Sequence, residues 1–299
     1  MADFLYISCL VDGKASRRKT DCSGWLKVGI SLKMDFIKLY CFYVKTFFKA
    51  RAEYRVSFFL GLAANFITYF LVYISYWIIT GKLQGIDGWS FEELTILYGI
   101  SLLTYAVAGT LLWYTVYNLS GMIIKGTLDV LLTRPMNIIK QLICYRFGDT
   151  FLAQILVTIL FLGIALYRER DRLDGIRLLY LLLILVSVVC LQMAGMLVVG
   201  AISFWTLKSE EIGEIFYYKF RKLTEYPLSI FPSIVQTTLT FVLPWAFINY
   251  YPSLLLLNKA EGTFERICGY AAPFVGVAAL FAALKFFYFG LRHYSGAGN

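Results

Sequence analysis

The sequence predicts an all-α integral membrane protein, in which an N-terminal amphipathic helix at the membrane interface is followed by six transmembrane helices. Of its 299 residues, 59% are hydrophobic and only 16% are charged, and the mean hydropathy is +0.68. A soluble domain of this composition would expose large apolar patches. Aromatic residues make up 18% of the chain, and they are favoured where helix ends meet lipid headgroups.

The first 33 residues match no part of this plan. Their short apolar run follows an acid rather than basic residues, which is not typical of a signal peptide. Met34 then begins a helical pattern. We therefore expect residues 1–33 to be a poorly ordered extension, or the product of an upstream translation start, and residues 34–299 to form one transmembrane domain.

Residues 34–55 have the pattern of an amphipathic helix. Apolar side chains recur every three or four positions, at Phe36, Ile37, Tyr40, Tyr43, Val44, Phe47 and Phe48. Lys38, Lys45 and Lys49 fall on another face. This pattern predicts a helix lying in the interface; the alternative is that the first spanning helix starts early.

Six apolar segments follow, and each is long enough to cross a bilayer, which takes about 20 residues. The segments are Ser57–Ile79, Leu94–Tyr117, Phe151–Tyr167, Leu178–Trp205, Ser233–Leu256 and Tyr270–Leu291. Pro244, Pro252 and Pro273 interrupt or flank the last two segments. The sequence thus predicts an even number of crossings.

The basic residues predict the orientation of these segments. With the N-terminus inside, 21 of the 28 Lys and Arg residues lie on the cytoplasmic side. We therefore expect both termini in the cytoplasm. The loop Arg168–Arg177 disagrees, because it carries four arginines on the outer side; its three acids offset much of that charge but count little in this rule.

The sequence predicts neither a catalytic nor a metal site. The six cysteines are scattered without a CxxC pair, and the single His293, beside Arg292 and without an acid near it in sequence, is expected to be an interfacial cation. No GxxxxGK[ST] phosphate loop is present, so nucleotide hydrolysis by that route is excluded. The net charge of +9 is spread over the gaps between spans, where it would meet membrane lipid rather than nucleic acid.

Polar residues within the apolar segments are mostly neutral. An ion-coupled carrier usually keeps ionisable groups at membrane depth, and acids are nearly absent there. The candidates for a substrate pathway are Asn65, Gln154, Gln192 and Gln236. The alternative role for these side chains is hydrogen bonding between helices.

Two gaps on the predicted cytoplasmic side have amphipathic helical patterns. In Leu119–Asp149, Lys125 and Asp129 form an i, i+4 pair, and Pro135 ends the helix. In Leu207–Pro232, apolar residues alternate with charged ones at helical spacing. We expect the first piece to lie parallel to the membrane and both pieces to be contact sites for a partner, the second through Glu210, Glu211, Tyr226 and Pro227. The alternative for either piece is a solvated connecting helix.

Three motifs carry a resemblance to a known family. They are G-x-L-D-x-L-L-x-R-P at Gly126–Pro135, L-x-x-Y-P-L-S-I-F-P at Leu223–Pro232 and LPWAFINYYP at Leu243–Pro252. In these motifs and in the order of its segments from Met34 onward, the sequence resembles the ABC-2 family of ABC-transporter permeases. The resemblance is to the prokaryotic branch, in which two permease subunits pair over two ATPase subunits, and it implies a location in a prokaryotic plasma membrane.

The resemblance implies a type V exporter-like architecture, and it implies a role for each of several segments and subunits. The helix after Met34 would be the connecting helix, and Tyr250–Leu257 a short re-entrant element. A coupling helix would fit a groove on the ATPase through Gly126, Leu128, Asp129, Leu132, Arg134 and Pro135. ATP and Mg²⁺ would be bound by the two ATPase subunits, and a second copy or a related permease would complete the pathway.

The function expected on this basis is that of a permease subunit of an ABC exporter with an amphipathic or hydrophobic substrate. The first alternative is a secondary transporter or channel that acts without an ATPase, and the lack of buried acids or of a charged pore ring argues against it. The second is a membrane-embedded enzyme, which the absence of a catalytic cluster disfavours.

Overall fold

The computed structural model describes residues 36–51, 55–83, 88–206, 209–294 and 296. These residues are helical and contain no β-strand, which confirms the all-α prediction. The chain divides into two units, one up to Gly61 and one from Leu62 onward. The predicted extension 1–33 lies outside the described residues.

The first unit contains α3 (Phe36–Arg51) and the beginning of α4 (Arg55–Leu83). Lys45, Lys49 and Phe42 are exposed on α3. The rings of Phe48 and Phe58 meet edge to face at 6.4 Å. The amphipathic helix is therefore a separate helix and not an early start of the first span, while its place in the interface stays a prediction.

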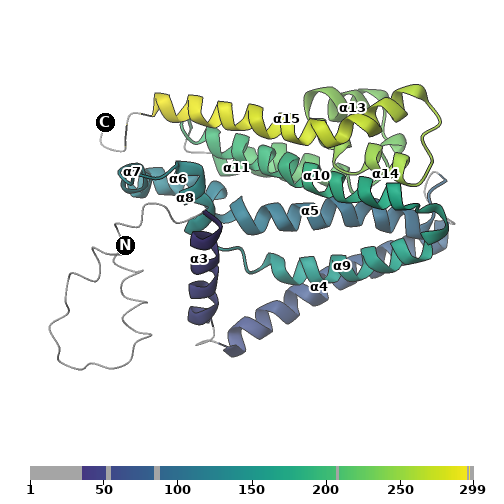
Figure 1. Ribbon diagram of the computed structural model, residues 1–299, viewed down its shortest axis with the longest axis horizontal. Helices are drawn as coiled ribbons and strands as arrows, with labels where there is room; N and C mark the ends of the chain where they lie inside the picture. The colour runs from purple at the N-terminus through teal and green to yellow at the C-terminus, as the bar shows by residue number, and fades with distance from the viewer. Residues whose placement is uncertain (1–35, 52–54, 84–87, 207–208, 295, 297–299) are drawn as a thin grey trace. The chain divides into compact units, whose positions relative to one another are not determined.

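Five helices among the described residues are long and apolar enough to cross a membrane. They are α4, α5 (Phe91–Tyr117), α9 (Phe151–Arg168), α10 (Gly175–Ile202) and α15 (Thr263–His293). They match five of the six predicted segments. Within the second unit, α5 packs between α9 and α10, and α15 packs along α10 (Figure 1).

The contact between α10 and α15 depends on a glycine. A methyl group at Gly276 would overlap the backbone of Ser187, so no larger residue permits this approach of the two helices. At the same level the Ser187 hydroxyl donates a 2.9 Å hydrogen bond to the carbonyl oxygen of Ala272. Small residues and an interhelical hydrogen bond thus replace the hydrophobic driving force that lipid cannot supply.

The predicted fifth segment, Ser233–Leu256, is broken. Its residues form α13 (Ser233–Thr237), the π-helical turn η5 (Thr238–Val242), η6 (Pro244–Phe247) and α14 (Tyr250–Leu256). The two halves meet at 75°. Pro244 explains the break, because proline disfavours a helical conformation in the preceding residue, and Leu243 is extended with φ −118° and ψ 97°.

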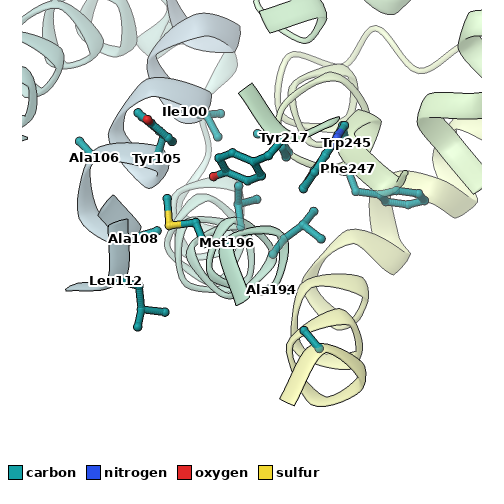
Figure 2. Packing of buried hydrophobic residues seen from close by; sticks show 14 of the residues in the cluster. Ile100, Tyr105, Ala106, Ala108, Leu112, Ala194, Met196, Tyr217, Trp245 and Phe247 are labelled. Atoms are coloured by element: carbon teal, nitrogen blue, oxygen red, sulfur yellow. The ribbon is translucent and has the colours of Figure 1, made fainter. Parts of the chain in front are cut away.

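The segment after α10 departs from the prediction. It forms α11 (Ser209–Gly213), the π-helical turn η3 (Glu214–Lys219) and α12 (Phe220–Leu223), and η4 (Leu228–Ile230) follows. Tyr217 is buried, and its hydroxyl donates a 2.8 Å hydrogen bond to Oε1 of Gln192 in the middle of α10. Figure 2 shows the Tyr217 ring between Tyr105 and Trp245, with centroid distances of 6.3 and 5.5 Å.

The two ends of this segment lie at opposite ends of α5. Glu210 accepts a 3.3 Å hydrogen bond from Ser120, just beyond the last turn of α5. At the other end, the side-chain amide of Asn249 donates to the carbonyls of both Thr224 and Leu97, and Leu97 lies near the start of α5. The segment therefore runs along the spans instead of lying as one amphipathic piece at the surface.

The loop of four arginines faces acids at the start of α5. Arg168 pairs with Glu92 at 2.9 Å, and Arg172 pairs with Glu93 at 2.7 Å. These contacts involve the loop residues up to η2 (Arg170–Arg172). Acids of the neighbouring span thus neutralise part of the loop's positive charge. The count of Lys and Arg residues that predicted the orientation does not include such contacts.

Candidate functional site

Three short helices connect α5 to α9: α6 (Leu119–Ile124), α7 (Thr127–Leu132) and α8 (Ile138–Tyr145). We call Leu119–Tyr145 the α6–α8 segment; it groups at the Tyr117 end of α5 (Figure 1). Gly126 separates α6 from α7 with φ +66°, a left-handed conformation that other residues adopt only at a cost. The glycine therefore allows the sharp turn that sets off α7 from α6.

The α7 helix has one buried and one exposed face. Leu128 and Leu131 are buried in the main hydrophobic core. Val130 and Leu132 are 51% and 40% exposed, and Ile124 on the adjoining α6 is 63% exposed. Of the predicted coupling residues, Leu128 thus packs inward, whereas Leu132, Arg134 and Pro135 lie at the surface and Gly126 and Asp129 are partly exposed.

The α6–α8 segment also contacts the last span. The Tyr288 hydroxyl in α15 donates a 3.0 Å hydrogen bond to Oδ1 of Asn137. The same Asn137 oxygen accepts the backbone N–H of Ile139 at 2.9 Å and so caps α8. Beyond the end of α15, burial and then the neighbouring Asp129 carboxylate raise the pKa of the Tyr294 hydroxyl. The segment is therefore connected to both α5 and α15.

The structure separates the four residues of the second predicted contact. Glu210 reaches Ser120 of α6, and Glu211 is exposed on the same short helix. The Tyr226 ring lies 6.0 Å from that of Tyr76 in α4, and Pro227 is buried. The intervening helix runs along α5 and carries Tyr226 and Pro227 to its other end, so the four residues do not share one surface. Contact of any of them with a partner stays a prediction.

The predicted pathway residues are also separated. Gln154 is buried and donates to the carbonyl oxygen of Leu102 at 3.1 Å. Gln192 is buried and accepts from Tyr217, as described above. Gln236 bonds within its own segment, to the carbonyl oxygen of Phe231 at 2.8 Å. Asn65 lines the cavity described below, whereas the three glutamines bond within and between helices, which is their alternative role.

That cavity is open and has a volume of about 390 Å³. It is lined by Asn65, Tyr69, Tyr105, Trp113, Thr150, Phe151, Glu214 and Tyr218. We call it the tyrosine cavity. Its walls come from α4, α5, the start of α9 and η3, and only Asn65 was singled out from the sequence. No local sequence pattern groups the other lining residues, and η3 was expected in a gap on the cytoplasmic side.

A buried charged pair lies next to this cavity. Arg221 is 3% exposed, and its guanidinium carbon lies 4.1 Å from the centroid of the Tyr105 ring. Its Nη2 is 3.7 Å from Oε1 of Glu225. A desolvated guanidinium is stabilised by such a ring face and by its carboxylate. The i, i+4 spacing of Arg221 and Glu225 was the available sequence signal, but it is equally typical of an exposed helix.

Comparison with known families gives an independent result. The sequence model described as "ABC-2 family transporter protein" matches residues 66–298, which include every long helix from the middle of α4 to α15. Comparisons with curated proteins and with solved structures found no match. Membership of this family implies a permease of an ABC transporter and partnership with ABC ATPase subunits. With its five long apolar helices and one bent pair, the chain is a multi-pass membrane protein that belongs to the ABC-2 transporter family.

Proposed function

We propose that this chain is the membrane subunit of an exporter of amphipathic or hydrophobic substrates, driven by two separate ATPase subunits that dock on the α6–α8 segment. The observation that supports this most directly is the apolar surface of that segment. Ile124, Val130 and Leu132 are largely exposed, while the other face of α7 is fixed in the core. A rigid, apolar projection beyond the spans is what a groove on a partner can hold.

The contacts of this segment supply a route for motion. Movement of the docked ATPases would push α7, whose buried leucines would carry α5 with them. The hydrogen bond between Asn137 and Tyr288 would pass the same displacement to α15. ATP and Mg²⁺ would be bound by the partner subunits, and differential docking in the two ATPase states would shift the equilibrium between inward and outward access.

The arrangement in the cell follows from this proposal. The α6–α8 segment would face the cytoplasm of a prokaryotic cell, with both termini on that side of the plasma membrane. A second copy or a related permease, together with membrane lipid, would complete the pathway. The amphipathic α3, whose Lys45 and Lys49 are exposed, would lie at the cytoplasmic interface as a connecting helix.

One observation favours a second candidate, a carrier that needs no ATPase. The Arg221–Glu225 pair lies at the depth of the spans, and ionisable groups there are typical of ion-coupled transport. Transport that follows an ion gradient in vesicles containing this chain alone would favour that candidate.

The docking surface can be tested by co-purification. The tagged chain is solubilised from its native membrane, and the bound ATPase is identified by mass spectrometry. We expect Val130→Asp to lose the ATPase, because it places a charge in an apolar contact, and Val130→Ile at the same position to retain it. Membrane fractionation confirms that both variants insert. Retention of the ATPase by Val130→Asp, or absence of an ATPase from the unmodified chain, would count against the proposal.

A further inference from the structure

We propose that the tyrosine cavity binds an organic cation, with the Glu214 carboxylate as its counter-charge and aromatic rings as its walls. This inference deepens the proposed function, since the cavity would be where the exporter takes up its substrate. It rests on three observations: the residues that line the cavity, the absence of an ion pair to Glu214 among the described residues, and the position of the cavity along the spans.

The lining is suited to a flat or bulky cation. Five of the eight lining residues are aromatic, namely Tyr69, Tyr105, Trp113, Phe151 and Tyr218. Ring faces attract cations electrostatically and pack against apolar groups at the same time. The volume of about 390 Å³ is within the range of roughly 300–1,000 Å³ typical of small-molecule sites. The cavity can therefore hold a compact molecule or a headgroup but not a polymer.

Glu214 is the one charged residue that lines the cavity. Among the described residues it makes no ion pair, whereas Glu92, Glu93 and Glu225 are each paired with a basic side chain. The Glu214 residue is exposed, so its carboxylate is open to a ligand cation, and the attraction between the two charges is the moderate one expected near a protein surface. The negative charge of Glu214 is thus available for a ligand.

Three basic residues lie near the cavity, and none of them lines it. Arg221 is stacked over Tyr105, as described above, and Lys222 Nζ lies 4.9 Å from the centroid of the Tyr218 ring. Arg146 lies over Tyr114 at 4.5 Å. Cations already on Tyr105 and Tyr218 weaken the attraction of those rings for a second cation. Charge recognition therefore depends chiefly on Glu214, which makes this residue decisive for a test.

The position of the cavity agrees with uptake from the side of the docking surface. Thr150, in its wall, immediately precedes α9 and is bonded to Tyr114 of α5 at 2.8 Å. Tyr114 is in the last turn of α5, next to the α6–α8 segment. In the proposed orientation the cavity therefore lies in the cytoplasmic half of the spans, where an exporter binds its substrate first.

Two probes of the same shape and opposite charge test the inference. Binding of tetraphenylphosphonium and tetraphenylborate to the purified full-length chain in dodecyl maltoside micelles is measured by equilibrium dialysis, with empty micelles as the blank. We expect saturable binding of the phosphonium that Glu214→Gln weakens about tenfold, equivalent to about 1.4 kcal/mol. Glu214→Asp should keep most of the affinity, and Glu261→Gln, at an exposed acid in the loop before α15, should leave it unchanged.

Each outcome is decisive. Equal affinity for the borate, or unchanged phosphonium binding in Glu214→Gln, would overturn the inference. Competition by a short-chain phosphatidylcholine would identify a lipid headgroup as the cation, and its absence would indicate a free solute; both results retain a cationic ligand. Since binding is measured without an ATPase, failure of the docking experiment above would refute the proposed function and leave this result standing.

Discussion

At the scale of single residues, Glu93 brings together several parts of the described chain. It is 3% exposed, accepts hydrogen bonds from Lys259 and from the N–H of Ser90, and pairs with Arg172. These partners come from the loops before α10 and before α15 and from the cap of α5 itself. One carboxylate thus joins three connections at the Phe91 end of α5.

Removal of this charge should destabilise the protein. Glu93→Gln leaves two cations without their buried partner, a change worth roughly 3–5 kcal/mol in a fully buried pair. Because Arg172 is 52% exposed, we expect about 1–3 kcal/mol here. Thermal unfolding in detergent measures the loss. The matched control is Glu92→Gln, whose partner Arg168 is 61% exposed; an equal loss in both variants would contradict the role assigned to Glu93.

Gly126 permits a second prediction at this scale. Its φ of +66° costs another residue about 1–2 kcal/mol, and there is space around it, since the nearest atom to an added methyl is Asp129 Oδ2 at 3.9 Å. We expect Gly126→Ala to lower the unfolding temperature through backbone strain alone. Gly121→Ala, in a helical conformation with no atom near the added methyl, should have no such effect. Equal shifts would exclude the conformational explanation.

At the scale of elements, continuous apolar runs predicted the five long helices correctly. The side chains of each of these helices face either the protein core or lipid, and both environments require apolar side chains. The length and hydropathy of a run are therefore sufficient to predict such a helix. The segment Ser209–Leu223 escaped prediction because Glu214, Lys219 and Arg221 are typical of a surface helix. What stabilises Arg221 at depth is the Tyr105 ring and Glu225, and a contact with a ring more than 100 positions away leaves no local pattern.

The candidate site shows the same limit. The α6–α8 segment was found because its turn glycine, helical spacing and Pro135 are local signals. The tyrosine cavity was not predicted, and of its lining residues the sequence singled out Asn65 alone, since the walls come from four elements. Similarly, Pro244 indicated an interruption, but the 75° bend that turns one predicted span into two arms depends on how α14 packs against α15.

The packing of α10 on α15 gives a prediction for these elements. Gly276→Ala would place a methyl group onto the backbone of Ser187, which cannot move aside as a flexible side chain could. We expect a loss of about 1–3 kcal/mol, typical of overpacking, visible as a lower unfolding temperature and lower yield. Gly163→Ala, with no atom within 4 Å of the added methyl, is the control. An unaltered Gly276→Ala protein would show that the two helices separate readily.

At the scale of the whole molecule, the proposed function requires coupling between ATP hydrolysis and transport. Asp129 lies on α7 within reach of Tyr294 beyond the end of α15. We expect Asp129→Lys to insert normally but to reduce transport per ATP hydrolysed, because the charge reversal changes the contact of the docking helix with its surroundings. Vesicles containing the complete complex measure both rates.

The control for this prediction is Asp171→Lys, also a charge reversal, at a residue whose side chain is 92% exposed. It lies in the loop between α9 and α10, at the other end of these spans. Its ratio of transport to hydrolysis should equal that of the unmodified complex. An unchanged ratio for Asp129→Lys would show that Asp129 has no part in coupling.

The burial of Arg221 has a consequence for biogenesis. An arginine at the centre of a membrane helix raises the free energy of insertion by about 2.5–3.5 kcal/mol. The translocon therefore inserts the stretch around Arg221 poorly when that stretch is alone. The ring that shields its guanidinium belongs to Tyr105, which is synthesised more than 100 residues earlier. The nascent chain therefore has to hold its second span in the bilayer before this stretch can enter, and the order of synthesis becomes part of how the protein reaches its native topology.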